Sequence, residues 1–143
     1  MSAPALTPST LYPSFYYDDA LAAIEWLCRA FGFQRRLVVP GPDDTVKHAE
    51  LSFGPAVLMV ATSRPAAGWV SPKSLAGLNS TTSLYVEDPD THFARALAAG
   101  ARVLRELRNE DHGGRGYMAR DPEGHQWYFG SYRPGAHWNA DPK

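Results

Sequence analysis

A repeated segment constrains the fold of this chain more than any other feature. Residues 14–32 read SFYYDDALAAIEWLCRAFG, and residues 83–100 read SLYVEDPDTHFARALAAG. Each copy has a short stretch that alternates between two faces, then acidic residues, then an apolar stripe at helical spacing, then a glycine. The chain therefore contains two copies of one unit that opens with a strand and a helix.

The second copy carries clear signals for the start and end of its helix. Asp88 can accept a hydrogen bond from an N–H of the first turn, and Pro89 suits the first helical position. Gly100 can adopt the left-handed conformation that ends a helix. The apolar stripe of this helix is formed by Phe93, Ala96 and Leu97. In the first copy the matching residues are Asp18 or Asp19 as cap, Ile24, Leu27 and Phe31 as stripe, and Gly32 as stop.

Three further strands are expected after each helix, separated by turn residues. In the first unit the strands are predicted at residues 11–17, 33–39, 47–53 and 56–61. In the second they are predicted at the start of the repeat and at residues 102–107, 115–120 and 126–132, with a type I turn at Asp121-Pro-Glu-Gly. This order predicts an α+β fold of two βαβββ modules. The expected segments are a flexible N-terminus at 1–10, modules at 11–62 and 80–132, a connecting loop at 63–79 and a tail at 133–143.

Composition excludes several classes of protein. The chain has 143 residues, a net charge of −1 and one cysteine, Cys28. An even charge distribution gives no reason to expect nucleic acid as a partner, and a single cysteine cannot form an intramolecular disulfide. The start MSAPALTPST lacks a basic and an apolar signal region, and the longest apolar run, residues 56–61, is too short to span a membrane. We therefore expect a cytoplasmic protein without a membrane partner.

Two segments, SLYVEDPDTHFARALAAGA and RGYMARDPEGHQWYF, together with the repeated module order, resemble the vicinal oxygen chelate superfamily, in particular its glyoxalase/bleomycin-resistance-like bacterial members. The resemblance covers about residues 10–132. It implies that the two modules pair into a curved sheet around a central groove, which holds a metal or a small molecule, and that the protein is a homodimer. Whether the modules pair within one chain or exchange between two chains is left open.

The same resemblance implies four metal-ligand positions, which fall on Tyr12, Glu50, Thr81 and Tyr128. Only Glu50 is a usual ligand of a divalent ion, so this set predicts weak metal binding and no metal cofactor. An alternative set would combine Glu50 with His48, on the same strand face, and His125. We favour surface and turn-stabilising roles for these two histidines.

Aromatic rings are expected on the groove-facing sides of the strands, where they can stack a flat ligand. Glu50 can meet a cationic group of that ligand, although Arg115 or Lys47 can also neutralise it, and the rings can also simply pack. Arg115 and Tyr117 follow two glycines and are expected at the rim. The opposite faces, with Phe15, Tyr17, Leu84, Val86, Trp127 and Phe129, are expected in the core. The predicted ligand-binding residues are Tyr12, Tyr16, Glu50, Thr81, Tyr85, Arg115, Tyr117 and Tyr128.

These features predict a binding protein that sequesters an aromatic or cationic small molecule, such as an aromatic antibiotic, without a metal. No catalytic residue is assigned, because Cys28 lies in a predicted helix and no Ser–His–acid set can be recognised. The alternative is a metal-dependent lyase, isomerase or dioxygenase of the same superfamily that uses Glu50 as ligand or base. A third reading is an accessory domain that binds no ligand.

Overall fold

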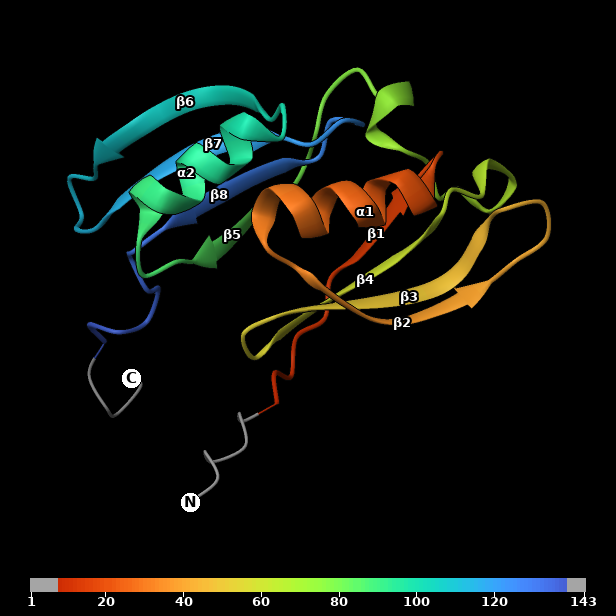
Figure 1. The fold of residues 1–143 in the computed structure, drawn as a ribbon, viewed down its shortest axis with the longest axis horizontal. Coiled ribbons are helices and arrows are strands. Elements are labelled where there is room, and N and C mark those ends of the chain that lie inside the picture. The colour runs from red at the N-terminus through yellow and green to blue at the C-terminus, as the bar shows by residue number, and fades with distance from the viewer. Residues whose placement is uncertain (1–7, 139–143) are drawn as a thin grey trace.

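Two modules with the same order of elements make up the computed structural model, which describes residues 8–138 (Figure 1). The first module consists of β1 (Ser14–Tyr17), α1 (Ala20–Phe31), β2 (Gln34–Pro40), β3 (Val46–Phe53) and β4 (Ala56–Thr62). The second consists of β5 (Thr82–Tyr85), α2 (Pro89–Ala98), β6 (Arg102–Asn109), β7 (Arg115–Arg120) and β8 (Gln126–Gly130). The predicted α+β fold of two βαβββ modules is confirmed.

Each module forms its own four-stranded sheet with the same topology. The strand orders are β1-β4-β3-β2 and β5-β8-β7-β6. In both sheets the first strand runs parallel to the last, and the other neighbours are antiparallel. The registers also match, since Ser14 pairs with Met59 in the first sheet and Ser83 pairs with Tyr128 in the second. These pairs define equivalent positions in the two modules.

The helices begin and end where the capping residues predict. The Asp19 carboxylate accepts a hydrogen bond from the Ala22 N–H at 3.1 Å, and Asp88 accepts one from the Thr91 N–H at 3.2 Å. Gly32 ends α1 with a φ of 87°, a conformation that glycine adopts without strain. The predicted stripe of α2 is wrong for Leu97, which is 47% exposed because this helix packs on its neighbours through one narrow face.

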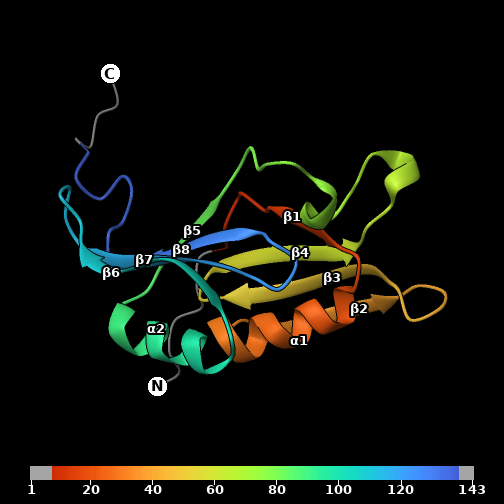
Figure 2. The same cartoon turned by 90° about the horizontal axis from the view of Figure 1, so that it is seen from above.

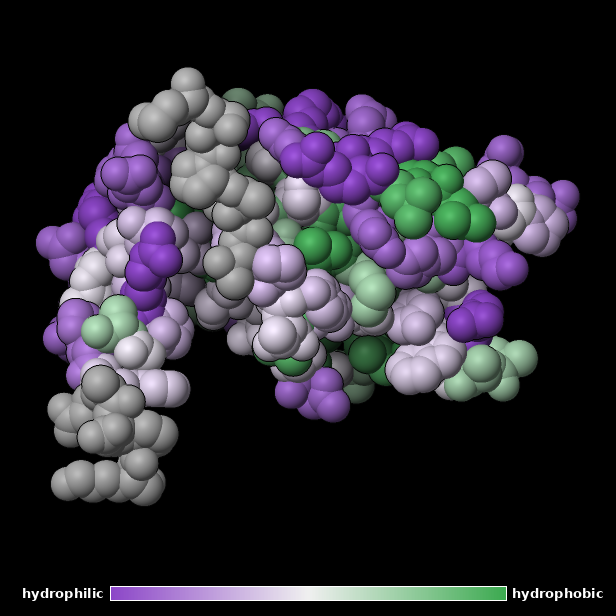
Figure 3. All heavy atoms as spheres, turned by 90° about the horizontal axis from the view of Figure 1, so that it is seen from below, coloured by the Kyte–Doolittle hydropathy of each residue, from purple (hydrophilic) through white to green (hydrophobic). Residues whose placement is uncertain are grey.

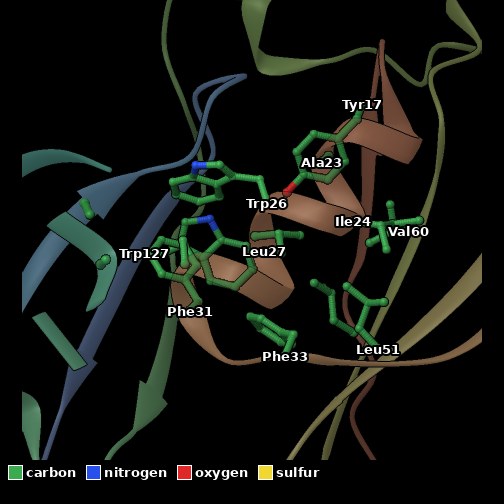
Figure 4. Close-up of a cluster of buried hydrophobic side chains, with 14 of the residues drawn as sticks. Tyr17, Ala23, Ile24, Trp26, Leu27, Phe31, Phe33, Leu51, Val60 and Trp127 are labelled. Carbon is green, nitrogen blue, oxygen red and sulfur yellow. The ribbon is translucent and has the colours of Figure 1, made fainter. Parts of the chain in front are cut away.

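The two modules share one hydrophobic core on the helix side of their sheets. Each helix packs on its own sheet, and α1 also contacts α2 (Figure 2). Trp127 and Phe129 of β8 contact Phe31 of α1, with ring centroids 5.6 and 4.5 Å apart. Figure 4 shows Trp127 of the second module beside the side chains of α1. The residues predicted for the core lie there: Tyr17, Val86, Trp127 and Phe129 are buried, and Phe15 and Leu84 pack against them.

The connection between the modules contains two short 3₁₀ helices, η1 (Pro65–Ala67) and η2 (Pro72–Ser74). Arg64 and Trp69, on either side of η1, form a β-bridge that folds the chain back on itself. Residues 1–7 of the predicted N-terminal segment and residues 139–143 of the predicted tail lie outside the described residues. None of the helices within residues 8–138 has both the length and the apolar character needed to cross a membrane.

Candidate functional site

Each sheet has one face that no helix covers, here called its open face. Along β3 and β8 the residues alternate, so Ala49, Leu51, Trp127 and Phe129 are buried while Glu50 and Tyr128 are partly exposed on the other side. The open faces therefore carry the polar and aromatic side chains expected in a ligand groove. Viewed from below, exposed apolar groups form separate clusters among polar ones (Figure 3).

The open face of the second module holds a pocket of about 360 Å³. Its volume falls within the range of roughly 300–1,000 Å³ that is usual for small-molecule sites. It lies above strands β5, β7 and β8, with the β6–β7 hairpin and the segment after β8 at its edges. The lining residues are Thr81, Ser83, Leu84, Tyr85, Arg105, Glu110, His112, Met118, Tyr128, Tyr132 and Pro134.

The ring of Tyr128 lies over a pair of glycines at one end of this pocket. Gly116 and Gly130 are paired across β7 and β8, and a Cβ added at Gly130 would be 2.5 Å from the Tyr128 hydroxyl. The Tyr128 hydroxyl oxygen is buried and has no hydrogen-bond partner with normal geometry among residues 8–138. Tyr128 therefore offers its ring to the pocket more than its hydroxyl, unlike the hydroxyl-bearing surface that the sequence suggested.

An ion-pair cluster forms the adjacent part of the pocket. The Arg105 guanidinium binds the Glu110 carboxylate through two hydrogen bonds of 2.8 and 3.1 Å, and Arg108 donates a third of 2.9 Å. Desolvation opposes ionisation of Glu110, but the two arginines hold its pKa below the usual value. Burial, followed by the nearby Glu110 carboxylate, raises the pKa of Tyr128. At neutral pH the pocket is therefore lined by a neutral phenol beside the Glu110 carboxylate and the Arg105 guanidinium.

The segment after β8 closes another side of the pocket. The Arg133 guanidinium carbon lies 3.7 Å from the centre of the Tyr85 ring, a cation–π geometry. The neighbouring Tyr132 lies close to Gly114 of the β6–β7 hairpin. A Cβ at position 114 would be only 2.7 Å from the Tyr132 backbone nitrogen. Glycine at position 114 thus permits this wall.

The open face of the first module holds a smaller pocket and has a different chemistry. His48 Nε2 lies 2.8 Å from Glu50 Oε2, and the two side chains are 39% and 41% exposed. The Tyr16 ring stacks on Trp69 of the connecting segment, with centroids 5.0 Å apart. A pocket of about 160 Å³ lies between Tyr16 and His48. The partner of Glu50 is therefore His48, and the suggested neutralisation by Arg115 is wrong because Arg115 binds Asp90.

The predicted site residues fall into separate groups. Thr81, Tyr85 and Tyr128 line the larger pocket, whereas Tyr16 lines the smaller one and Glu50 lies nearby. Tyr12 precedes β1, is 44% exposed and donates its hydroxyl hydrogen to the Ser9 carbonyl. Neither of these two pockets is lined by members of both groups. One chain therefore presents two separate candidate sites.

The structure places Tyr117 and Arg115 away from both candidate sites. Tyr117 is fully buried, because it alternates with Met118 along β7 and so points to the helix side. Its hydroxyl lies 2.6 Å from His92 Nδ1, while His92 Nε2 lies 2.8 Å from the Phe31 carbonyl oxygen. Tyr117 thus belongs to a buried contact between α2 and α1, and its predicted position at the rim of the groove is wrong. Arg115 pairs with Asp90 of α2 at 3.0 Å.

The turn between β7 and β8 joins the two modules, a role that sequence reasoning missed. Asp121 Oδ2 accepts hydrogen bonds from the Tyr17 hydroxyl at 2.6 Å and from the Trp127 indole N–H at 3.1 Å. Glu123 accepts hydrogen bonds from the backbone N–H groups of Asp18 and Asp19 at 2.7 and 2.8 Å, just before α1. It also accepts one from the Ser71 hydroxyl at 2.6 Å. We call these contacts the joint.

His125, predicted to stabilise the turn, also belongs to this region. Its ring stacks on Phe15 with centroids 4.3 Å apart and an interplanar angle of 5°. Its Nε2 lies 3.2 Å from the Tyr16 carbonyl oxygen. Burial lowers the pKa of His125 and also that of His92, although nearby acceptors raise both in part. Both imidazoles therefore favour the neutral form in the folded protein.

Comparison with known proteins assigns a family to this geometry. Residues 11–129 match the Glyoxalase/Bleomycin resistance protein/Dioxygenase superfamily. The chain belongs to this superfamily. It is 37% identical over 123 residues to the uncharacterized protein Mb0911c of Mycobacterium bovis, across 84% of this chain and 81% of that protein. The predicted resemblance is confirmed.

Solved structures show the same fold. The crystal structure of TioX from Micromonospora sp. ML1 is 35% identical, covers 87% of this chain and 99% of its own, and has a TM-score of 0.68. Lactoylglutathione lyase from Agrobacterium tumefaciens is similar in fold, with 20% identity, a TM-score of 0.62 and coverage of 86% of this chain and 93% of its own.

The donor residues do not fit the superfamily's metal site. Among residues 8–138 there is no group of three or more His, Cys, Asp or Glu side chains placed to hold an ion. Glu50 lies on β3 and Tyr128 on β8, so they are not equivalent; the position equivalent to Tyr128 is Met59. Of the four predicted positions, Tyr12, Thr81 and Tyr128 are poor donors for Zn²⁺, Ni²⁺ or Fe²⁺ compared with imidazole and carboxylate, and only Glu50 is a usual ligand.

Proposed function

We propose that the protein binds and sequesters an aromatic small molecule in the cytoplasm without using a metal ion. The observation that carries this proposal is the 360 Å³ pocket on the second open face, where the rings of Tyr128 and Tyr85 are accessible. Stacking on such rings, with polar groups at the edge, is a common way to hold a planar ligand. An aromatic antibiotic is a suitable ligand class, in keeping with the bleomycin-resistance members of the superfamily.

We propose further that a second copy of the chain completes the groove. The two modules of one chain are joined on their helix sides, so each open face is a half-site with one wall. A homodimer would pair the first open face of one copy with the second open face of the other. Glu50 and His48 would then lie opposite Tyr128, where the carboxylate can meet a cationic group of the ligand. Sedimentation equilibrium should give twice the chain mass; a monomer at micromolar concentration would contradict this arrangement.

Titration with a panel of planar aromatic antibiotics, followed by calorimetry and protein fluorescence, tests the binding function. We expect saturable binding that Tyr128→Ala weakens by about tenfold or more, equivalent to roughly 1.4 kcal/mol. Trp138→Ala is the matched control, because Trp138 is 79% exposed and lines neither half-site. Equal loss in both variants, or no binding by any compound, would refute the proposed function.

The hydrogen-bonded pair of His48 and Glu50 supports a second candidate, an enzyme of the lyase, isomerase or dioxygenase type. A histidine and a carboxylate at 2.8 Å can act as a general base or supply two metal ligands. Metal analysis of gently purified protein distinguishes the candidates. Stoichiometric Ni, Zn, Fe or Mn that is lost in Glu50→Gln would favour the enzyme over the binding protein.

A further inference from the structure

A further cavity of about 370 Å³ lies at the other end of the second sheet from the β6–β7 hairpin and shares no lining residue with the 360 Å³ pocket on the open face. It is enclosed by the connecting segment around Pro72–Ser74, the start of β6, the end of β7 and the β7–β8 turn, which lie together in Figure 1. The turn is the one that forms the joint. Three cationic side chains line this cavity: Lys73, Arg102 and Arg120.

The two arginines are held together by the sheet. Arg102 and Arg120 are directly opposite each other in the β6–β7 register, so their side chains leave the same face of the sheet. Like charges in directly opposite positions destabilise a sheet unless something neutralises them. Neither arginine forms an ion pair within residues 8–138. The fold thus brings two positive charges together at a cavity without supplying their counter-ion.

Arg120 is also short of hydrogen-bond acceptors. Its Nε is buried and has no partner among the described residues. Buried donors in folded proteins almost always have an acceptor, and one that lacks it calls for an explanation such as an absent ion. An oxyanion placed against the Nε edge of a guanidinium can accept two parallel hydrogen bonds.

The acidic residues at the cavity have other partners. Asp121 accepts five hydrogen bonds, two from Tyr17 and Trp127 and three from the backbone N–H groups of the turn. Glu123 accepts three from the start of α1 and from Ser71. Both carboxylates are almost fully buried in the joint, at 4% and 9% exposure. With three cations and two carboxylates the lining still has a net charge of +1.

We propose that this cavity binds a small molecule carrying a phosphate group, through Arg102, Arg120 and Lys73. A phosphate supplies the acceptors that the Arg120 Nε lacks and neutralises the opposed arginines. The cavity volume of about 370 Å³ suits a small phosphomonoester, being at the lower end of the usual range for small-molecule sites. The bound group would bridge the connecting segment, the second sheet and the joint, and would therefore stabilise the folded protein.

Thermal unfolding of the full chain tests this site. Inorganic phosphate and glycerol 2-phosphate are the probes, citrate is the carboxylate comparison, and KCl at matched ionic strength controls for screening. We expect a saturable rise in Tm of about 4 °C at ten times the Kd, larger for the phosphomonoester. Arg120→Gln and Arg102→Gln should each abolish the rise, whereas Arg29→Gln, an exposed residue of α1, should retain it.

The same variants separate ligand binding from a structural role. Without phosphate, Arg120→Gln should leave Tm unchanged or raise it, because one of two opposed charges is removed; a fall would indicate that the arginine is structural and would count against the site. An equal rise in Arg120→Gln and the parent, or no rise with either phosphate probe, overturns the proposal. A larger rise with citrate than with either phosphate also overturns it, in favour of a polycarboxylate.

Discussion

The joint and the open faces use similar residue types for different purposes. In the joint, the Asp121 and Glu123 carboxylates are nearly buried, and backbone and side-chain N–H and O–H donors surround them. On the open faces, Glu50 is 41% exposed and has one imidazole partner, and Tyr85 is 37% exposed. The comparison teaches that the Asp121 and Glu123 carboxylates, with several donors each, hold the two modules together, whereas Glu50, with one partner and free surface, remains accessible to a ligand. The predictions below test that distinction.

The largest effect is expected from the aromatic core beside the joint. Trp127→Ala should lower the free energy of unfolding by about 3–5 kcal/mol, because it removes a fully buried indole and leaves a cavity. Trp69→Ala, at a ring that is 49% exposed, should cost less than about 1 kcal/mol. Urea denaturation measures both. Similar losses in the two variants would remove the contrast between the core and the open faces.

A smaller loss is expected from the joint carboxylate. Glu123→Gln should lower the free energy of unfolding by about 2–3 kcal/mol, because the N–H groups before α1 lose a charged acceptor. The matching change Glu50→Gln should cost roughly 0–1 kcal/mol, since exposed ion pairs contribute little. Urea denaturation of both variants at pH 7.5 measures the difference. If Glu50→Gln costs as much as Glu123→Gln, the open face is part of the architecture.

The buried imidazoles should make the free energy of unfolding sensitive to acid. Burial lowers the folded-state pKa of His92, with Arg95 adding to the effect, so the unfolded chain takes up a proton first. Its contribution to stability is fully present above pH 6.5, the ordinary value, and is lost as the pH falls below it. The urea midpoint should decline between pH 7.5 and 5, and His92→Gln should reduce that slope. An unchanged slope in His92→Gln would show that His92 does not contribute.

The last prediction concerns a small effect on stability, at the contact between the segment after β8 and the 360 Å³ pocket of the second module. Arg133→Ala removes a guanidinium group at 3.7 Å from the Tyr85 ring, a contact worth about 0.5–1 kcal/mol. Ligand affinity should change more than the free energy of unfolding, because Tyr85 lines the pocket and loses the guanidinium group over its ring. Calorimetry and urea denaturation of the same variant measure the two. A loss of stability above about 2 kcal/mol would show that this wall supports the fold.

The fold could be predicted because its signals are local. Asp19, Gly32 and Asp88 cap helices through contacts within a few residues, and strand alternation sorts Phe129 from Tyr128. Strand β1 is shorter than predicted, since Pro13, which has no N–H, lies before its first residue. The superfamily followed from the same repeated pattern. Caps and strand alternation depend on residues that are close together in the sequence, so they can be predicted from it.

The site was less predictable because its contacts are long-range. Glu123 contacts Asp18, 105 residues away in the sequence, so the local sequence predicts the turn but not its contact with the first module. Tyr117 was placed at the rim, yet alternation with Met118 could have shown that it shares the inner face with Ala119. The glycine pair beneath Tyr128 depends on the β7–β8 register, which no single stretch of sequence contains. His48 and Glu50 were correctly placed on one strand face, and the structure shows them hydrogen-bonded.

The matched registers of the two sheets have a consequence for how mutations in the two repeats would act. Equivalent positions now carry unlike residues, with Met59 in one repeat where Tyr128 stands in the other. In the proposed dimer each of the two binding sites would be formed by the first repeat of one copy and the second repeat of the other. A mutation in one repeat would therefore change the same wall of both sites and leave the opposite wall unchanged. Selection can then reshape recognition of one end of a ligand while the other end, and the seam between the repeats, stays as it was.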